Sequence, residues 1–176
     1  YPPLHTAAHA VFCSHQHFDH DAAGCVTLLP GRVSPFVVRE VPAFHDDRGG
    51  TLRGGNVIRI FTAGNVSVAH LGDLGHQLTE AQLQDIGPVD GVLIPVGGVY
   101  TLDADGARKV CQALRPKWVV PMHYFHAPYG LPELAGAEDF LKLWPEADIH
   151  LLSGADFTVT EDTAGVIVPK FSSAEA

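Results

Sequence analysis

The sequence predicts a layered α/β fold, because short apolar strands alternate with amphipathic helices over its second half. Residues 92–96 are wholly apolar, as expected for a strand in a sheet that is covered on both faces. Metal-binding side chains directly follow several of the predicted strands. Because strand ends lie along one edge of a sheet, we expect these side chains to converge there.

Composition limits the class of protein. The 176 residues suffice for one domain with a sizeable core. Twenty acidic residues against 11 basic ones give a formal net charge of −9, which argues against a nucleic-acid-binding protein. No apolar run approaches the roughly 20 residues of a membrane span, and Tyr1-Pro2-Pro3 does not resemble a signal peptide. Three cysteines without a CxxC pair favour a cytoplasmic location.

Strand signals run along the whole chain. The segment 8–13 is apolar, and we expect it to form a strand buried in the interior of a sheet. Ala63-Gly64-Asn65 is typical of a hairpin turn between two strands. The other predicted strands cover residues 33–44, 56–61, 66–70, 92–96, 118–121, 149–152 and 166–168.

Three helices are predicted. Thr79-Glu80-Ala81-Gln82 matches a capping box, so a short helix should run to about Ile86. A second helix is expected from about Asp105 to Leu114, and a third from Ala137 to Trp144. The apolar side of the second helix should consist of Ala107, Val110, Cys111 and Leu114.

The segment Ser14–Asp21 contains three histidines and two aspartates within eight residues. On an extended segment, His15 and His17 point to the same side, while a following turn would carry Asp19 and His20 toward a second point. Imidazole and carboxylate are common metal ligands near neutral pH. A single histidine would indicate an ordinary surface loop, but this density of donors favours two adjacent metal positions.

Three more candidate ligands follow strands farther along the chain. His45 lies on a glycine-rich loop after one strand, and His123 follows the apolar strand 118–121. Asp73 lies between glycines, which let the backbone bend tightly and bring the carboxylate close to a ligand. Their recurrence at strand ends extends the predicted metal site beyond the first motif.

The motifs SHQHFDHD, FHDD, HLGDLGH, PVGG and PMHY resemble, as an ordered set, the metallo-β-lactamase superfamily. The residues of these motifs are similar to those of the branch of uncharacterised Zn-dependent or metal-dependent hydrolases, which resembles the ascorbate-phosphate lactonase-like proteins. This resemblance implies an αββα sandwich with two divalent metal ions. Zinc is the first choice, and Mn, Fe, Co and Ni suit the same ligands. By motif, the first ion would bind His15, His17 and His45, and the second Asp19, His20 and His123, with Asp73 bridging them.

The chain departs from this family before the first motif. Members usually begin with strands ahead of HxHxDH, whereas here only residues 1–13 precede it. We therefore expect residues 1–176 to form a single hydrolase domain that lacks its N-terminal strands and exposes a sheet edge. Two explanations follow: a second copy covers that edge as a homo-oligomer, or the gene product has a preceding segment. We favour the second.

The resemblance implies a hydrolase that directs a metal-bridging hydroxide at a small ester, lactone or phosphodiester. Asp73 and Asp19 would be the catalytic carboxylates, with Asp19 as the proton carrier. The substrate would be a small molecule, with an anionic one among the options. The alternative is a non-catalytic metal-binding protein or an incomplete fragment of such a domain.

Several polar residues near the motifs have two interpretations. His70 and His76 would either orient the ligands or contact substrate, or else cap backbone groups. The hydroxyl of Tyr124 would donate to an oxyanion, or the ring is simply half-buried. Arg48 and Arg53 would hold an anionic substrate or remain solvated. The neighbouring loop acids, Asp46 and Asp47, are expected to be solvated unless they orient His45.

Overall fold

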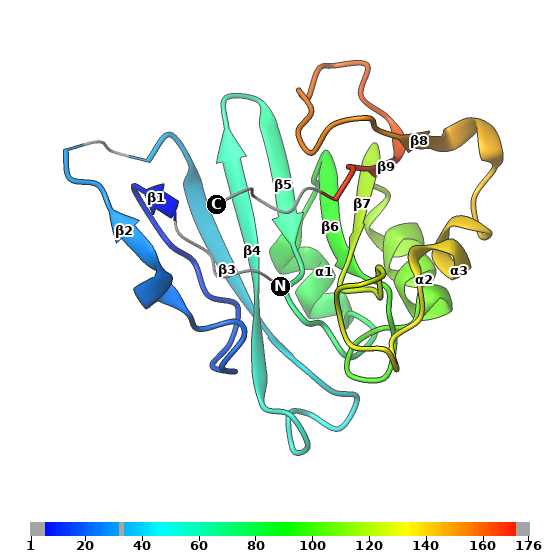
Figure 1. Cartoon of the computed structure of the whole chain (residues 1–176), viewed down its shortest axis with the longest axis horizontal. Helices are drawn as coiled ribbons and strands as arrows, with labels where there is room; N and C mark the ends of the chain where they lie inside the picture. The colour runs from blue at the N-terminus through cyan, green and yellow to red at the C-terminus, as the bar shows by residue number, and fades with distance from the viewer. Residues whose placement is uncertain (1–5, 32–33, 172–176) are drawn as a thin grey trace.

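A computed structural model describes residues 6–31 and 34–171, which form two sheets and three α-helices (Figure 1). The small sheet is a parallel pair of β1 (Thr6–Ala8) and β2 (Val26–Leu28), with the 3-10 turn η1 (Ala23–Cys25) before β2. The strands of the large sheet are β3 (Val37–Phe44), β4 (Gly55–Ala63), β5 (Val66–His70), β6 (Gly91–Pro95), β7 (Trp118–Met122), β8 (Ile149–Leu151) and β9 (Gly165–Val168). The helices are α1 (Glu80–Ile86), α2 (Ala104–Leu114) and α3 (Ala137–Leu141), and the 3-10 turn η2 (Glu146–Asp148) precedes β8.

The large sheet has the strand order β3-β4-β5-β6-β7-β9-β8. Strands β3, β4 and β5 are antiparallel, and all pairs from β5 onward are parallel. Consequently β3, β5, β6 and β7 run in one direction, and their C-terminal ends share one edge. The predicted hairpin is confirmed: Ala63 pairs with Val66, and Gly64 adopts a positive φ of 57° in the turn.

Strand β3 forms one edge of the large sheet and has features that limit pairing with another chain. Pro42 lacks a backbone N–H donor, and Arg39 and Glu40 add exposed charge. The guanidinium of Arg39 donates to the carbonyls of Asp85 and Ile86, at the end of α1. The edge is thus tied to a helix as well as to β4.

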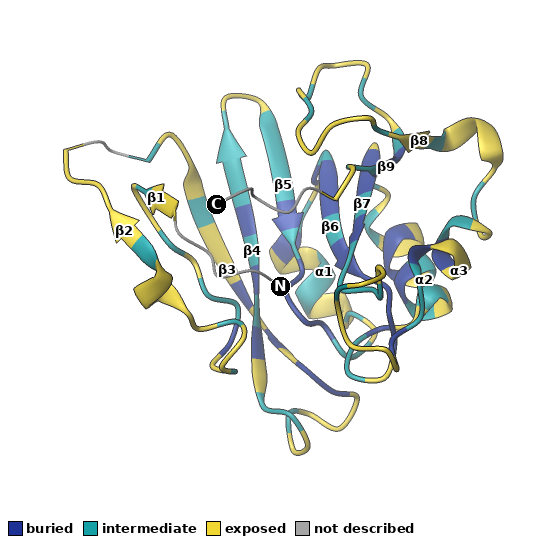
Figure 2. Cartoon of the chain, viewed as in Figure 1, coloured by how far each residue is buried: buried dark blue, intermediate teal, exposed yellow. Residues whose placement is uncertain are grey.

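The main core lies between one face of the large sheet and the three helices (Figure 2). Alternate residues of β4, Ile58 and Ile60, are fully buried, and they meet Ile86 of α1 and Phe140 of α3 in one cluster. Side chains on the opposite face of β4, such as Phe61, are half-buried. The layered α/β class predicted from the sequence is confirmed.

The predicted first residues of the three helices agree with the structure to within one residue. The capping box at α1 is present, since Gln82 N donates to Thr79 Oγ1 and Thr79 N donates to Gln82 Oε1. Helix α2 buries Ala107, Val110 and Cys111, three of the four residues predicted for its apolar side. Helix α3 ends at Leu141 instead of the predicted Trp144. Pro145 follows Trp144, and a residue before proline is disfavoured in the helical conformation.

The prediction of a buried strand before the first motif is wrong. Residues 9–13 form no strand, and His9, Ala10 and Phe12 are exposed. The segment passes the end of β4 that β5 leaves unpaired, where Val57 N donates to Ser14 O at 2.9 Å. Arg59 Nη1 donates to the carbonyl of Cys13 at 2.6 Å. These isolated bonds do not make a ladder, so the short apolar run stays outside the sheet.

Within the described residues, no helix is long and apolar enough to cross a membrane.

The core predicts a large difference between two truncations. Phe140 is fully buried between α3 and the sheet, so Phe140→Ala should lower the free energy of unfolding by about 3–5 kcal/mol. Leu151 on β8 is 71% exposed, and Leu151→Ala should change it by no more than about 0.5 kcal/mol. Urea unfolding of the two variants measures the difference. Equal losses would mean that α3 does not contribute to the core as described.

Candidate metal centre

The predicted ligands gather at the edge where β3, β5 and β7 end. His45 directly follows β3, Asp73 lies three residues beyond β5, and His123 directly follows β7. The HxHxDH segment reaches the same edge beside the start of β4, through the bond between Val57 N and Ser14 O. Parallel strand direction therefore brings together residues that are distant in sequence.

Four histidine side chains converge on a single oxygen of Asp73. The distance from Asp73 Oδ2 to the Nε2 atom is 3.3 Å for His45, 3.3 Å for His123, 3.4 Å for His20 and 3.9 Å for His15. Asp73 itself is only 4% exposed. This carboxylate is thus a common neighbour of four histidines, and its role as a bridge between two ions stays a prediction.

The donor atoms form two overlapping groups. Those of His15, His17 and His45 lie within 4.8 Å of one another, and so do those of His15, His20 and Asp73. The first group coincides with the set predicted for the first ion. Asp19 lies at the outer side, with its Oδ2 3.7 Å from His20 Nε2 and its side chain 52% exposed.

The hydrogen bonds of two buried histidines leave nitrogen atoms available for a metal ion. His15 Nδ1 pairs with Ser14 Oγ at 2.9 Å, while its buried Nε2 has no hydrogen-bond partner among the described residues. His45 Nδ1 donates to the carbonyl of Tyr100 at 3.0 Å, and its Nε2 faces Asp73. A ligand histidine typically donates its other ring nitrogen in this way. The donor set and its unpartnered nitrogen fit divalent metal ions.

Asp73 and its histidine neighbours shift one another's pKa values. Burial would raise the pKa of Asp73, but hydrogen bonds from His123 and His45 and the nearby positive charge hold it well below its ordinary range. Burial lowers the pKa of His45 and of His123, yet the hydrogen bond and charge of Asp73 outweigh it, so both pKa values are raised. For His15, burial dominates and lowers the pKa to about 4. Asp73 is therefore an anion that its neighbours stabilise.

The tight bend before Asp73 depends on a buried amide that the sequence analysis did not single out. Asn56 is 2% exposed; its Nδ2 donates to Leu71 O at 2.8 Å, and its Oδ1 accepts from Asp73 N at 3.0 Å. Gly72 has a φ of 56°, and a Cβ there would collide with Asn56 Oδ1. Asn56 shares the inward face of β4 with Ile58 and Ile60. A polar residue two positions before buried apolar residues of the same strand was the sign in the sequence that its side chain has a specific partner.

Asp46 is a second residue whose role the sequence analysis did not predict. The side chain is buried and accepts four backbone N–H groups, from Arg48, Gly50, Leu52 and Arg53, at 2.8–3.0 Å. It therefore fixes the loop after His45, and the expectation of a solvated acid is wrong for Asp46. Asp47 is exposed, as expected. Burial would raise the pKa of Asp46, but the backbone hydrogen bonds lower it to about 2.

The three residues assigned to substrate or ligand support lie close to backbone and core. His70 Nδ1 accepts from Gly72 N at 3.1 Å, so this imidazole caps the bend before Asp73. His76 bonds two backbone groups, accepting from Phe44 N through Nε2 and donating to Gln77 O through Nδ1. Tyr124 packs half-buried against the core cluster. Backbone capping describes His70 and His76, and a contact with substrate stays a prediction for all three.

His123 adopts a left-handed backbone conformation with a φ of 53°. Its carbonyl accepts from Gly97 N at 3.0 Å, and a Cβ on Gly97 would collide with that oxygen. A positive φ is uncommon for a residue with a side chain and costs about 1–2 kcal/mol. The contact with Gly97 holds this conformation, which accompanies an imidazole directed at Asp73.

Fold and site together define an α/β protein whose candidate metal ligands lie at the C-terminal edge of a mixed sheet. The chain belongs to the beta-lactamase superfamily, because residues 1–123 match the family model described as a beta-lactamase superfamily domain. The predicted family is thereby confirmed.

Named relatives agree with this membership. Proteins called UPF0173 metal-dependent hydrolase from Pyrococcus furiosus and Pyrococcus horikoshii are 33% identical over 117 residues and 31% identical over 137 residues. These matches cover 65% and 76% of this chain, and 50% and 59% of the relatives. The chain thus spans about half the length of the curated relatives that it matches.

Solved structures support the fold. A proposed Zn-dependent hydrolase of the metallo-beta-lactamase superfamily from Thermotoga maritima is 32% identical, with a TM-score of 0.74. The match covers 94% of this chain and 83% of that one. A proposed metal-dependent hydrolase from Parabacteroides distasonis, 17% identical, has the same fold with a TM-score of 0.54 over 91% of this chain and 75% of its own.

The Asp46 loop predicts a pH-dependent contribution to stability. Its pKa of about 2 lies below the ordinary 3.8, so the ionised carboxylate stabilises the folded state above pH 3.8, and this stabilisation is lost as the pH falls toward 2. Asp46→Asn replaces one acceptor oxygen by a donor and should lower the urea midpoint of metal-free protein at pH 7. It should also weaken the dependence of that midpoint on pH in the acid range. Asp47→Asn is the matched control, and equal midpoints for both variants would contradict the role of Asp46.

Proposed function

We propose that this protein is a dinuclear metal-dependent hydrolase. The observation that carries the proposal is the convergence of four imidazole nitrogens on Asp73 Oδ2, beside the group formed by His15, His17 and His45. One carboxylate between two sets of nitrogen donors could be shared by a pair of divalent ions. The printed names of the relatives, metal-dependent hydrolase, support the same reaction class.

His15, His17 and His45 would hold one ion and Asp19, His20 and His123 the other, with Asp73 shared between them. Nitrogen and carboxylate donors suit zinc first, and also Mn, Fe, Co and Ni. When bound, such ions lower the pKa of a coordinated water toward about 7 and polarise the substrate oxygen. The Tyr100 carbonyl fixes His45 with Nε2 directed toward Asp73, so the ring is oriented before an ion binds.

The carboxylates of Asp73 and Asp19 would have separate roles in the reaction. Asp73 is buried and keeps its negative charge at neutral pH, because its histidine neighbours depress its pKa. Asp19 is half exposed and within 3.7 Å of His20 Nε2, so it has access to solvent on one side and to the site on the other. Asp19 would therefore take a proton from the attacking water and pass it to the leaving group or to solvent.

The substrate we propose is a small ester, lactone or phosphodiester. A non-catalytic metal-binding role, or an incomplete hydrolase fragment, is the alternative, and turnover by the metal-loaded protein distinguishes them. The free thiols of Cys13, Cys25 and Cys111 favour a reducing location such as the cytoplasm. A single domain over residues 1–176 and a homo-oligomeric state stay predictions.

The shared carboxylate predicts the number of bound ions. Wild-type protein reconstituted with zinc should hold about two ions per chain, and Asp73→Ala about one or fewer, because both ions would lose a common ligand. Elemental analysis after removal of excess metal measures this directly. Asp47→Ala, which removes an exposed acid from the same edge, should still hold two. Saturation of wild-type protein at one ion would refute a dinuclear centre.

The ligand histidines should matter more for turnover than for folding. His15→Ala and His123→Ala should each lower hydrolysis of a chromogenic ester or phosphodiester at least about a hundredfold, the scale expected when a metal site or its close support is damaged. Each variant should destabilise the metal-free protein less than it reduces activity, because loop and strand-end ligands add little core packing. Loss of folded structure in either variant would assign the residue a structural role instead.

A further inference from the structure

Tyr100 joins three segments beside the metal centre. Its backbone carbonyl accepts from His45 Nδ1 at 3.0 Å, and its hydroxyl donates to Glu133 Oε1 at 2.7 Å. Its ring lies 5.4 Å from the guanidinium carbon of Arg53, within the range of a cation–π contact. One residue thus connects a ligand histidine with the segment after His123 and with an arginine.

Two hydrogen bonds bring the backbone at Arg53 and Gly54 close to that at His45 and Asp46. Arg53 N donates to Asp46 Oδ2 at 2.8 Å, and His45 N donates to the carbonyl of Gly54 at 3.1 Å. The loop that begins at His45 therefore closes on itself at Arg53. This arrangement anchors the base of the arginine side chain to the same structure that holds the ligand.

The guanidinium of Arg53 and the imidazole of His45 also bind consecutive carbonyls of one loop. Arg53 Nη2 donates to Val99 O at 3.2 Å, and His45 Nδ1 donates to the next carbonyl, that of Tyr100. Val99 has a φ of 60°, a rare conformation for a β-branched residue. Such strained residues cluster at functional sites, so the loop presents these carbonyls in an enforced orientation.

Arg53 has no carboxylate partner among the described residues, in common with Arg48 and in contrast to three other cations of the chain. Arg59 pairs with Glu40, Lys117 with Asp90 and Lys142 with Asp139. Arg53 is half-buried, and one hydrogen bond to a carbonyl leaves most of its five N–H donors unused. A positioned guanidinium with free donors matches the two oxygens of a carboxylate or a phosphate.

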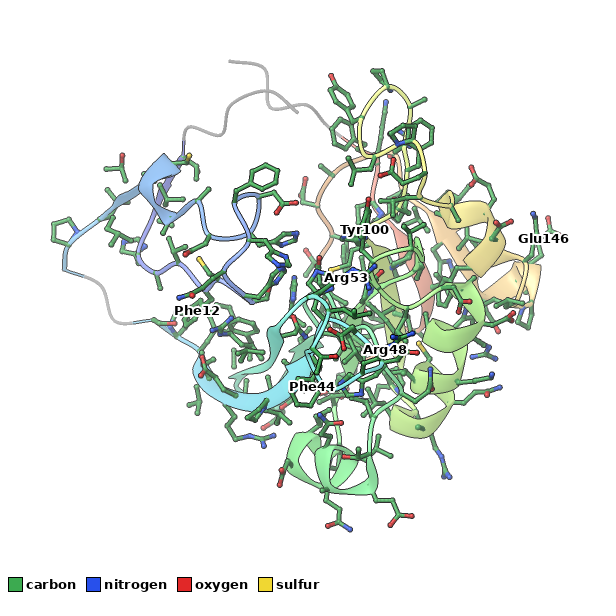
Figure 3. The ribbon with its side chains drawn as sticks, turned by 90° about the horizontal axis from the view of Figure 1, so that it is seen from below. Phe12, Phe44, Arg48, Arg53, Tyr100 and Glu146 are labelled. Carbon is green, nitrogen blue, oxygen red and sulfur yellow. The ribbon has the colours of Figure 1, made fainter. Side chains whose placement is uncertain are left out.

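We infer that Arg53 is the residue that selects a substrate bearing an oxyanion, a carboxylate or a phosphate, for the metal centre. The inference rests on the proposed hydrolase function and narrows its substrate class. Tyr100 is the positioning residue, because its ring supports the guanidinium while its carbonyl orients His45. Figure 3 shows Arg53 beside Tyr100 and Arg48 farther from it.

Arg48 provides a matched control on the same loop. It carries the same charge, is exposed, and its side chain has no hydrogen bond or ion pair among the described residues. A long-range effect of positive charge would therefore act through Arg48 as well as through Arg53. An effect confined to Arg53 requires direct contact with the anion.

The test compares wild type, Arg53→Gln, Arg53→Lys and Arg48→Gln, all reconstituted with zinc. The substrates are the anionic bis(p-nitrophenyl) phosphate and the neutral p-nitrophenyl acetate. Arg53→Gln should raise KM for the anionic substrate about tenfold or more, the scale of one lost charge-assisted hydrogen bond, and change kcat less than about twofold. Arg53→Lys should recover part of the loss, and Arg48→Gln should change KM less than about twofold. For the neutral ester all variants should match wild type.

Binding is measured separately, so that the inference does not depend on turnover. Calorimetric titration with phenylphosphonate and with benzoate should show about tenfold weaker binding to Arg53→Gln for the oxyanion that the site prefers, at unchanged zinc content. The two ligands distinguish phosphate from carboxylate selection. Wild-type protein that binds these anions through Arg53 but hydrolyses neither substrate would contradict the hydrolase proposal alone. Unchanged anion binding by Arg53→Gln, an equal loss on the neutral ester, or an equal effect of Arg48→Gln would overturn the inference.

Discussion

The site depends on one buried anion. Asp73 is almost fully enclosed, and an ionised carboxylate in such a place is destabilising unless charged or donating groups surround it. Here the surrounding groups are imidazoles, and those of His45 and His123 donate hydrogen bonds to the carboxylate. A bound metal ion would supply positive charge in place of their protons. The same electrostatic requirement would therefore keep the ligands together with or without an ion.

Contacts with the sheet hold Asp73, and loops surround it. The bend before Asp73 follows a buried strand and is bonded through Asn56 to the neighbouring strand β4. Gly72 allows that contact because it lacks a Cβ. The loops that carry Arg53 and Tyr100 lie outside the strands and are held by side-chain bonds and by backbone bonds of their own. Such a division suits an enzyme fold in which one metal centre serves different substrates.

The sequence allowed accurate prediction wherever local chemistry decides the structure. The capping box at Thr79 and the hairpin at Gly64 follow from short-range rules, and both agree with the structure. The alignment of candidate ligands at strand ends follows from the general rule that parallel strands end at one edge of a sheet. The roles of Asn56, Asp46 and the Tyr100 carbonyl were not predicted, because their partners are backbone groups fixed only by tertiary contacts. An apolar run before the first motif suggested a strand, but a strand forms only where a neighbour supplies a full ladder.

The weak attachment of the first motif to the sheet has a consequence for how tightly ions bind. Residues 9–20 carry His15, His17, His20 and Asp19, yet their backbone forms isolated hydrogen bonds to β4, through the carbonyls of Cys13 and Ser14. Most of the proposed ligands thus lie on one segment, residues 9–20. Detachment of this segment from the sheet would cost less free energy than unfolding of the sheet. A metal ion held by this segment together with His45 and His123 would tie the segment to the sheet, and part of its binding energy would be spent on ordering the segment. The affinity for metal would consequently change with any substitution that stiffens or loosens this segment, even when every ligand is kept.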